Sequence, residues 1–383
     1  MADFGFTEAQ EMFRHHVRDF ARRELAPGAK ERAKLGTLPA EAVKKLADAG
    51  LLGLTLPEKY GGQPSDWVSL GIMHEEIAKI DFGLIHSMVI VPAAGMALLE
   101  GSEEVRREWL PALARGEKAA CLCLTEPDAG SDAAALKSRA VRDGDSYVLS
   151  GDKTSVTRGM EADVAMVFAK TDPAARARGV TCFWVPLNLP GISRSPLEGM
   201  GFGPLGRATI AFDQVRVPVS WRVGKEGEGF YLVMRQFDFI RVLLALQCLG
   251  MAQASLEEAT AYAMQRTAFG RPIARFEAVS FRLAEDHTRI EAARLLCYRT
   301  LWLKDQGQPH TKETAMSKYL GIQTAVQAIH NALLIHGHFG YSVEFPFEQR
   351  LRDTIGLEIG DGTADIMRVV IAREMMGREF LPY

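Results

Sequence analysis

The pattern of apolar residues changes twice along this chain of 383 residues. Apolar residues recur at helical spacing in the first and last thirds, whereas the middle third holds short runs rich in β-branched and aromatic residues. This order predicts an α+β protein with a helical N-terminal domain, a central β-barrel or sandwich, and a C-terminal bundle of long helices. We expect these domains to span residues 1–120, 121–222 and 223–383.

Capping and turn residues place individual elements within these domains. Thr7 and Gln10 form a capping-box pattern, and Pro39 and Gly50 bracket a second helix. The remaining expected elements are three N-terminal helices (66–80, 84–99, 103–115), four strands (147–151, 164–170, 181–187, 208–218) and three long helices (228–265, 276–306, 311–336), with two shorter helices after them.

Composition excludes several classes of partner. The net charge is −3 and no block of basic residues stands out, so neither nucleic acid nor an anionic membrane surface is expected to bind. The longest uncharged stretch, 83–99, is short for a membrane span and contains His86 and Pro92, which favours a buried helix. Five scattered cysteines form neither a metal spacing nor a disulfide framework, which fits a cytoplasmic protein.

Two segments around the predicted strands carry small and hydroxyl-bearing residues. In CLTEPDAGSD (123–132), Gly130 and Ser131 would let main-chain N–H groups approach phosphate oxygens, and Thr125 could contact a polar ring edge; a simple turn is the alternative. In KTSVTRG (153–159), Ser155 and Thr157 are expected on one face of a strand. The run GFGPLG (201–206) matches G-x-G-x-x-G, but a strand pattern follows it, so a turn is expected.

Three C-terminal segments leave functional and structural interpretations open. RTAFGRPIARFE (266–277) could bind phosphate through Arg266 and stack a ring on Phe269, or could simply join two helices. His336 and His338 have no carboxylate or cysteine at matching spacing, so no metal site is expected. Asp361 lies between two glycines before the N-cap Thr363, where it could shape a turn or act as a general base.

Taken together in order, these segments resemble the acyl-CoA dehydrogenase family. The resemblance covers essentially the whole chain. It rests on TEPDAGSD, K-x-x-V-T (153–157), FDFIR (237–241), R-x-x-F-G-x-x-I (266–273), HGHFGY (336–341) and DGT followed by ADIMRVVIARE. The resemblance implies an FAD enzyme that oxidises an acyl-CoA thioester at its α,β bond, assembles as a homotetramer and passes electrons to an electron-transfer flavoprotein.

The resemblance also implies roles for individual residues. Asp361 falls at the position of the catalytic base. The residues expected to contact CoA are Ser131, Phe237, Asp238 and Arg241. The residues expected to bind FAD are Leu122, Leu124, Thr125, Gly130, Ser131, Ser155, Thr157, Thr363 and Asp365, with His336, Gly337 and His338 on the adenine side and Arg266, Phe269 and Glu277 supplied by a neighbouring subunit.

The chain departs from the family pattern near the reacting carbons. Asp361 replaces the usual Glu, Gly360 replaces the adjacent Tyr, and Ser155 replaces a Trp beside the flavin; Ile240 occupies the other known base position and cannot serve. An Asp base and an enlarged pocket are features of relatives that act on alicyclic acyl-CoAs. We therefore expect an alicyclic or branched substrate such as cyclohexanecarboxyl-CoA. The alternatives are a straight-chain acyl-CoA dehydrogenase, an oxygen-using flavin oxidase and a non-catalytic scaffold.

The FAD contacts on the adenine side depart from the family pattern too. Glu277 and Leu334 stand where the family has Gln, and His338 replaces the second glycine of a Gly-Gly pair. These differences concern the details of cofactor contacts and leave the cofactor itself unchanged.

Overall fold

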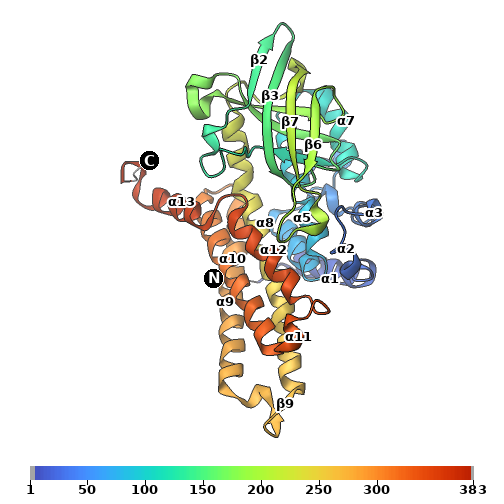
Figure 1. The fold of residues 1–383 in the computed structure, drawn as a ribbon, viewed down its shortest axis with the longest axis vertical. Coiled ribbons are helices and arrows are strands. Elements are labelled where there is room, and N and C mark those ends of the chain that lie inside the picture. Colours follow the sequence, from blue (N-terminus) through green and yellow to red (C-terminus); the bar gives the residue numbers. More distant parts are fainter. Residues whose placement is uncertain (1–4, 381–383) are drawn as a thin grey trace.

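A computed structural model describes residues 5–380 of the chain. Its α-β-α order confirms the predicted fold class: helices, then a mixed sheet, then a bundle of long helices. Figure 1 shows the sheet at one end of an elongated molecule and the tips of the long helices at the other, with the N-terminal helices beside their junction.

The N-terminal domain is a set of short helices. Their bounds are α1 Glu8–Phe20, α2 Ala29–Arg32, α3 Ala40–Asp48, α4 Trp67–Ala78, α5 Phe82–Met88, α6 Ile90–Leu98 and α7 Glu103–Ala114. The capping box of Thr7 and Gln10 is present at the start of α1, and Pro39 precedes α3 as expected. The single helix expected at 84–99 is wrong, because Pro92 has no N–H for the Met88 carbonyl and the helix divides at Val89.

The central domain is one mixed sheet with two four-stranded segments. The strands are β1 Ala120–Cys123, β2 Arg139–Asp143, β3 Ser146–Val156, β4 Val164–Lys170, β5 Val180–Pro186, β6 Ile192–Pro196, β7 Ala208–Pro218 and β8 Arg222–Val223. Segment β6-β7-β3-β2 meets segment β1-β4-β5-β8 through a single pair, Arg139 and Lys170. The GFGPLG run forms a turn and a short 3-10 helix before β7, as expected.

Strand β4 connects the cores of the sheet and the helices. Ala165 and Val167 pack inside the sheet domain, whereas Val164, Met166 and Phe168 belong to the large core shared with the helices. Because successive side chains of a strand point to opposite faces, β4 is buried on both sides. Neighbouring β1 leads directly into the TEPDAGSD loop, so the loop starts from a rigid element.

The C-terminal domain is built around α8. The bounds are α8 Gly229–Gln265, α9 Glu277–Asp305, α10 Thr311–His336, α11 His338–Tyr341, α12 Phe347–Ile359 and α13 Ala364–Met376; a hairpin of β9 Thr267–Ala268 and β10 Arg271–Pro272 joins α8 to α9. Helix α8 is long and apolar enough to cross a membrane, but 89% of its apolar window is buried within the protein. Packing inside the bundle therefore accounts for its apolar character.

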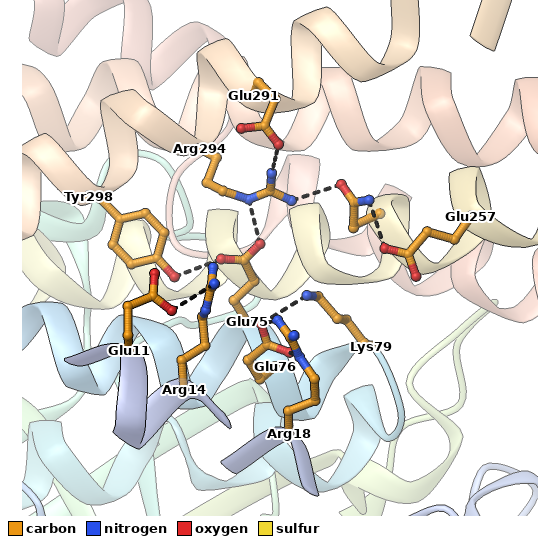
Figure 2. Close-up of polar contacts among 11 residues, drawn as sticks. Glu11, Arg14, Arg18, Glu75, Glu76, Lys79, Glu257, Glu291, Arg294 and Tyr298 are labelled. Carbon is orange, nitrogen blue, oxygen red and sulfur yellow. Dashed lines mark hydrogen bonds and ion pairs between the residues drawn. The ribbon is translucent and has the colours of Figure 1, made fainter. Parts of the chain in front are cut away.

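A polar cluster fixes α4 between the N-terminal helices and the bundle (Figure 2). The Glu75 carboxylate accepts from Arg294 Nε at 2.6 Å and from the Tyr298 hydroxyl at 2.6 Å, both on α9. Its neighbour Glu76 accepts from Arg18 Nη2 at 2.8 Å on α1. Burial alone would raise the pKa of Glu76, but the Arg18 hydrogen bond and the Lys79 charge lower it below its ordinary value.

Candidate active site

The TEPDAGSD loop and the end of β3 lie against each other. The main-chain N–H of Thr154 donates to the Thr125 carbonyl at 2.9 Å. Within residues 5–380, the hydroxyls of Thr125, Ser131 and Thr157 have no side-chain or main-chain partner, and Ser131 is exposed. This set of free donors and acceptors fits the polar edge and phosphates of FAD.

A buried ion pair holds this loop to β3. Lys153 is 0% exposed, and its Nζ lies 2.7 Å from Glu126 Oε1 and 3.2 Å from the Leu124 carbonyl. The Glu126 carboxylate also accepts hydrogen bonds from the main-chain N–H groups of Lys137 and Ser138. The sequence interpretation used Lys153 only as part of a motif and missed that it fixes the loop.

The expectation that Ser155 and Thr157 share one strand face is wrong. The β3–β7 register shifts between Lys153 and Val156, Ser155 takes a left-handed φ of 56°, and the strand ends before Thr157. A bulge of this kind interrupts the alternation of side chains. Ser155 is exposed and accepts a hydrogen bond from Arg207 Nη2 at 3.2 Å, a neighbour that the motifs did not indicate.

Asp361 lies in the loop between α12 and α13, where two buried cations hold its main chain. Arg241 Nε donates to the Asp361 carbonyl at 2.8 Å, and Lys318 Nζ donates to the Gly362 carbonyl. Asp361 takes a left-handed φ of 55°, and Thr363 caps α13 through the Ile366 N–H as expected. The sequence interpretation did not include Lys318.

The FDFIR segment is buried beside this loop. Arg241 is 7% exposed and lies 4.9 Å over the Phe237 ring, and burial lowers its pKa. Asp238 accepts from the Thr311 hydroxyl at 3.0 Å, and burial raises its pKa. Ile240 is 4% exposed, so this position provides an apolar wall. The CoA contacts of Phe237, Asp238 and Arg241 stay predictions, and Arg241 also contacts the Asp361 loop.

His86 on α5 is a second polar group near Asp361. Its ring stacks parallel on Phe202 at 5.4 Å, and its Nδ1 lies 3.0 Å from Gln247 Oε1. Burial lowers the pKa of His86, while the Gln247 hydrogen bond and the Asp361 charge oppose that effect. Sequence patterns placed His86 only in a buried helix, because its neighbours on α8 and in the 201–206 turn are distant in the chain.

Arg266, Phe269 and Glu277 lie at the other end of the bundle from Asp361. All three are exposed, Phe269 to 95%, and Figure 1 shows their hairpin at the tip opposite the sheet. Arg266 caps α8 about 37 Å along the helix axis from Arg241. One chain therefore cannot bring these residues and the Asp361 loop to the same flavin ring.

The His336–His338 segment is part buried and part exposed. His336 Nδ1 lies 2.9 Å from the Ala332 carbonyl, and its ring stacks on Tyr262 at 4.3 Å. Gly337 and His338 are exposed, as is Asp365, which pairs with Arg368 at 2.5 Å. The side chain of His336 is thus packed in the core. His338 and the main chain of this segment are the groups available to contact a ligand.

Comparisons with known proteins agree along the whole chain. Three family models match in order: acyl-CoA dehydrogenase N-terminal domain at residues 7–117, middle domain at 121–215 and C-terminal domain at 227–376. An acyl-CoA dehydrogenase of Bacillus subtilis (strain 168) is 38% identical over 374 residues, covering 97% of this chain and 99% of that protein.

Two solved structures extend this similarity to three dimensions. Butyryl-CoA dehydrogenase from Megasphaera elsdenii has a TM-score of 0.93 at 33% identity, covering 98% of this chain and 100% of that chain. A chain in the structure described as the electron transferring flavoprotein of Acidaminococcus fermentans has a TM-score of 0.94 at 35% identity, with coverage of 98% and 100%.

Proposed function

The chain belongs to the acyl-CoA dehydrogenase family, FAD-dependent oxidoreductases that act on acyl-CoA, and we propose that Asp361 is its catalytic base. The observation that carries this proposal is the loop geometry. Two buried cations bind the main-chain carbonyls of Asp361 and Gly362, and within residues 5–380 no hydrogen bond or ion pair engages the Asp361 carboxylate. The alternative base position holds Ile240, which cannot accept a proton.

The chemistry assigns separate tasks to the main chain and the side chain of Asp361. The carboxylate removes the α-proton of the thioester, and the electrons left on the α-carbon form the new α,β double bond. In the part of the chain described, the Asp361 N–H has no acceptor, so it is available to the thioester carbonyl as negative charge develops there. Bound FAD supplies the acceptor for the β-hydrogen, which leaves as a hydride.

Replacing the carboxylate tests this role. We expect Asp361→Asn to retain the yellow FAD spectrum but to lose two to four orders of magnitude in the rate of flavin reduction. Glu358→Gln is the matched control, because it removes a carboxylate from the last turn of α12 three residues before the base. Near-normal bleaching of Asp361→Asn by substrate would remove Asp361 from this role.

For the acyl group we propose an alicyclic or branched chain, with cyclohexanecarboxyl-CoA as the reference substrate. Gly360 has φ −60° and ψ 149°, a conformation open to any residue, and a Cβ there would meet nothing closer than 3.6 Å. Its small size is therefore not required by the backbone and leaves room beside the base. Ser155, exposed at the end of β3, leaves further room where the family has a tryptophan.

A panel of acyl-CoAs separates this proposal from the straight-chain alternative, which similarity to butyryl-CoA dehydrogenase supports. We expect cyclohexanecarboxyl-CoA to give a higher kcat/KM than butanoyl- or octanoyl-CoA, by about 10–200-fold. Ser155→Trp should reduce activity with the ring substrate more than with a short linear one. Asp361→Glu should retain some activity and shift preference toward slimmer chains. Higher kcat/KM with linear substrates would refute the enlarged-pocket proposal alone.

For the electron acceptor we propose an electron-transfer flavoprotein. Support comes from the similarity to a chain in the structure of such a protein from Acidaminococcus fermentans. Rapid oxygen consumption by the reduced enzyme without added acceptor would instead favour the oxidase alternative. A purified protein that cannot be loaded with FAD would favour the non-catalytic scaffold.

We further propose a homotetramer in the cytoplasm. Large apolar side chains are exposed on the C-terminal bundle, among them Phe281 at 61%, Trp302 at 53% and Tyr341 at 79%. Together with the remote position of Arg266 and Phe269, they favour an assembly in which one subunit completes the cofactor site of another. All five cysteines are free and buried, in keeping with a reducing compartment.

A further inference from the structure

Lys318 on α10 is a buried cation, and no carboxylate of the residues that the structure describes lies within ion-pair distance of it. It is 1% exposed, and its one hydrogen bond within residues 5–380 is the donation to the Gly362 carbonyl. Lysine is rarely enclosed to this degree without a paired acid, because desolvation of the ammonium group is unfavourable. Something other than stability therefore accounts for a lysine at this position.

The contact of Lys318 falls on the segment that carries the base. Together with Arg241 it binds two consecutive carbonyls, those of Asp361 and Gly362. Charge-assisted hydrogen bonds of this kind are the stronger ones and fix the loop while Asp361 holds its left-handed φ of 55°. The same arrangement favours glycine at position 362. Its φ of +100° is one that other residues rarely adopt, and an added Cβ would lie only 3.3 Å from Arg241 Nη2.

Titratable groups on α8, on α12 and in the Asp361 loop act on the Lys318 ammonium group. Burial lowers the pKa of Lys318 to about 8, and the Asp361 charge is the strongest effect opposing it. The other titratable groups that act on it are Arg241 and Cys248 from α8 and Glu358 from α12.

We propose that Lys318 is a positioning residue for proton abstraction, which fixes the Asp361 loop through the Gly362 carbonyl and so holds the Asp361 carboxylate in place for the substrate. The proposal rests on the assignment of Asp361 as the base. Lys318 touches main chain and not substrate, so its effect passes through Asp361. Burial of the charged Lys318 side chain lowers the stability of the folded protein, which distinguishes Lys318 from a residue that only supports the fold.

The lowered pKa of Lys318 determines how its effect on protein stability changes with pH. The folded protein releases the Lys318 proton near pH 8, whereas an unfolded lysine keeps it to about pH 10.5. The unfavourable burial of charge is fully present below pH 8 and is relieved as pH rises toward 10.5. Lys318→Met should therefore melt no lower than wild type at pH 7, and its advantage should shrink between pH 8 and 10.

The test combines kinetics and stability in FAD-loaded enzyme. Rapid-mixing flavin reduction over a range of acyl-CoA concentrations is measured for wild type, Lys318→Met, Lys318→Gln and the control Lys312→Met, which removes a partly exposed lysine of the same helix. Lys318→Met should slow reduction about 100-fold. Lys318→Gln keeps a donor and should lose less. In both, the limiting rate of reduction should fall while the acyl-CoA concentration at half-saturation stays that of wild type, and Lys312→Met should match wild type in both quantities.

The outcomes separate this inference from the function on which it rests. A wild-type limiting rate in Lys318→Met would overturn the inference. A slower rate combined with a lower melting temperature at pH 7 and a higher half-saturating acyl-CoA concentration would also overturn it, because the role would then be structural. If no acyl-CoA of the panel reduces wild-type enzyme, the proposed function fails and the inference with it.

Discussion

Replacement of Lys153 by methionine should both loosen the TEPDAGSD loop and destabilise the protein. Lys153 is 0% exposed and Glu126 6%, and their charged atoms lie 2.7 Å apart. Lys153→Met leaves the Glu126 carboxylate buried without its cation and the Leu124 carbonyl without its donor. Only the two main-chain N–H groups that bind Glu126 persist.

The magnitude follows from the burial of the pair. Breaking a buried ion pair by removing one partner costs about 3–5 kcal/mol. For a chain of this length that unfolds cooperatively, the corresponding fall in melting temperature is about 4–6 °C. Because Leu124 and Thr125 are expected to line the flavin, we also expect faster loss of FAD on dilution. The loss should be larger than stability alone accounts for, since the loop itself is released.

The pH dependence of this effect has a defined sign. Burial alone would raise the pKa of Glu126, but the Lys153 charge and the Lys137 N–H lower it below its ordinary value. Burial lowers the pKa of Lys153 despite the attraction of Glu126, because the lysine is the more deeply enclosed partner. The stabilisation by Glu126 is present above its unfolded pKa and lost as pH falls through its folded pKa. Wild type and Lys153→Met should therefore converge in acid.

Melting curves and FAD fluorescence on dilution measure these effects, with Lys137→Met as the control. Lys137 pairs with Asp128 on the surface at 2.8 Å, and such pairs contribute about 1 kcal/mol or less. Combining Lys153→Met with Glu126→Gln should cost less than the sum of the two single changes, by about 0.5–3 kcal/mol. Additive costs, or FAD retention equal to wild type, would show that the pair does not hold the loop.

Three further changes test the rest of the molecule. Arg294→Met should lower stability by about 3 kcal/mol in denaturant titrations, because it leaves Glu75 buried beside one remaining side-chain donor; an unchanged midpoint would contradict this. The pKa of Glu76 is lowered, so wild type should lose stability as pH falls through that value, and Glu76→Gln should flatten this dependence in melts at pH 3–6. Arg266→Ala should weaken FAD retention and lower the FAD-dependent melting temperature. A stable FAD-loaded monomer in size-exclusion chromatography would oppose a contribution of Arg266 across subunits.

Long periodic segments of the chain were predictable because local and tertiary preferences agree there. The helices expected at 228–265, 276–306 and 311–336 occur at 229–265, 277–305 and 311–336, and two of the four expected strands have the predicted bounds. Strands β2, β6 and β8 were missed because two to five residues are too short for a periodic signal. The break at Val89 was missed for another reason: the apolar run predicted one continuous helix, but Pro92 interrupts the helical hydrogen bonds.

The candidate site was predictable only where chemistry lies within a motif. Asp361 and Thr363 stand out because glycine and N-cap patterns are local, and Thr363 caps its helix as expected. Lys318 and His86 did not stand out, because their significance depends on partners 44 and 161 residues away. Ser155 was placed on the wrong face because a β-bulge depends on the partner strand, which no single segment encodes.

Because Asp361 is shorter than a glutamate, the position of its main chain largely determines where its carboxylate lies. A glutamate can correct a small displacement of its backbone through an additional side-chain torsion, whereas an aspartate has one methylene less and about 1.5 Å less reach. Both carbonyls next to the carboxylate are held by buried cations, and Gly362 permits the backbone turn between them. A precisely held Asp361 together with the small Gly360 leaves space for substrate bulk that a glutamate beside a tyrosine would fill. The features that shorten the proposed base and those that immobilise it therefore agree with the proposed kind of substrate, one that is wide at its α-carbon.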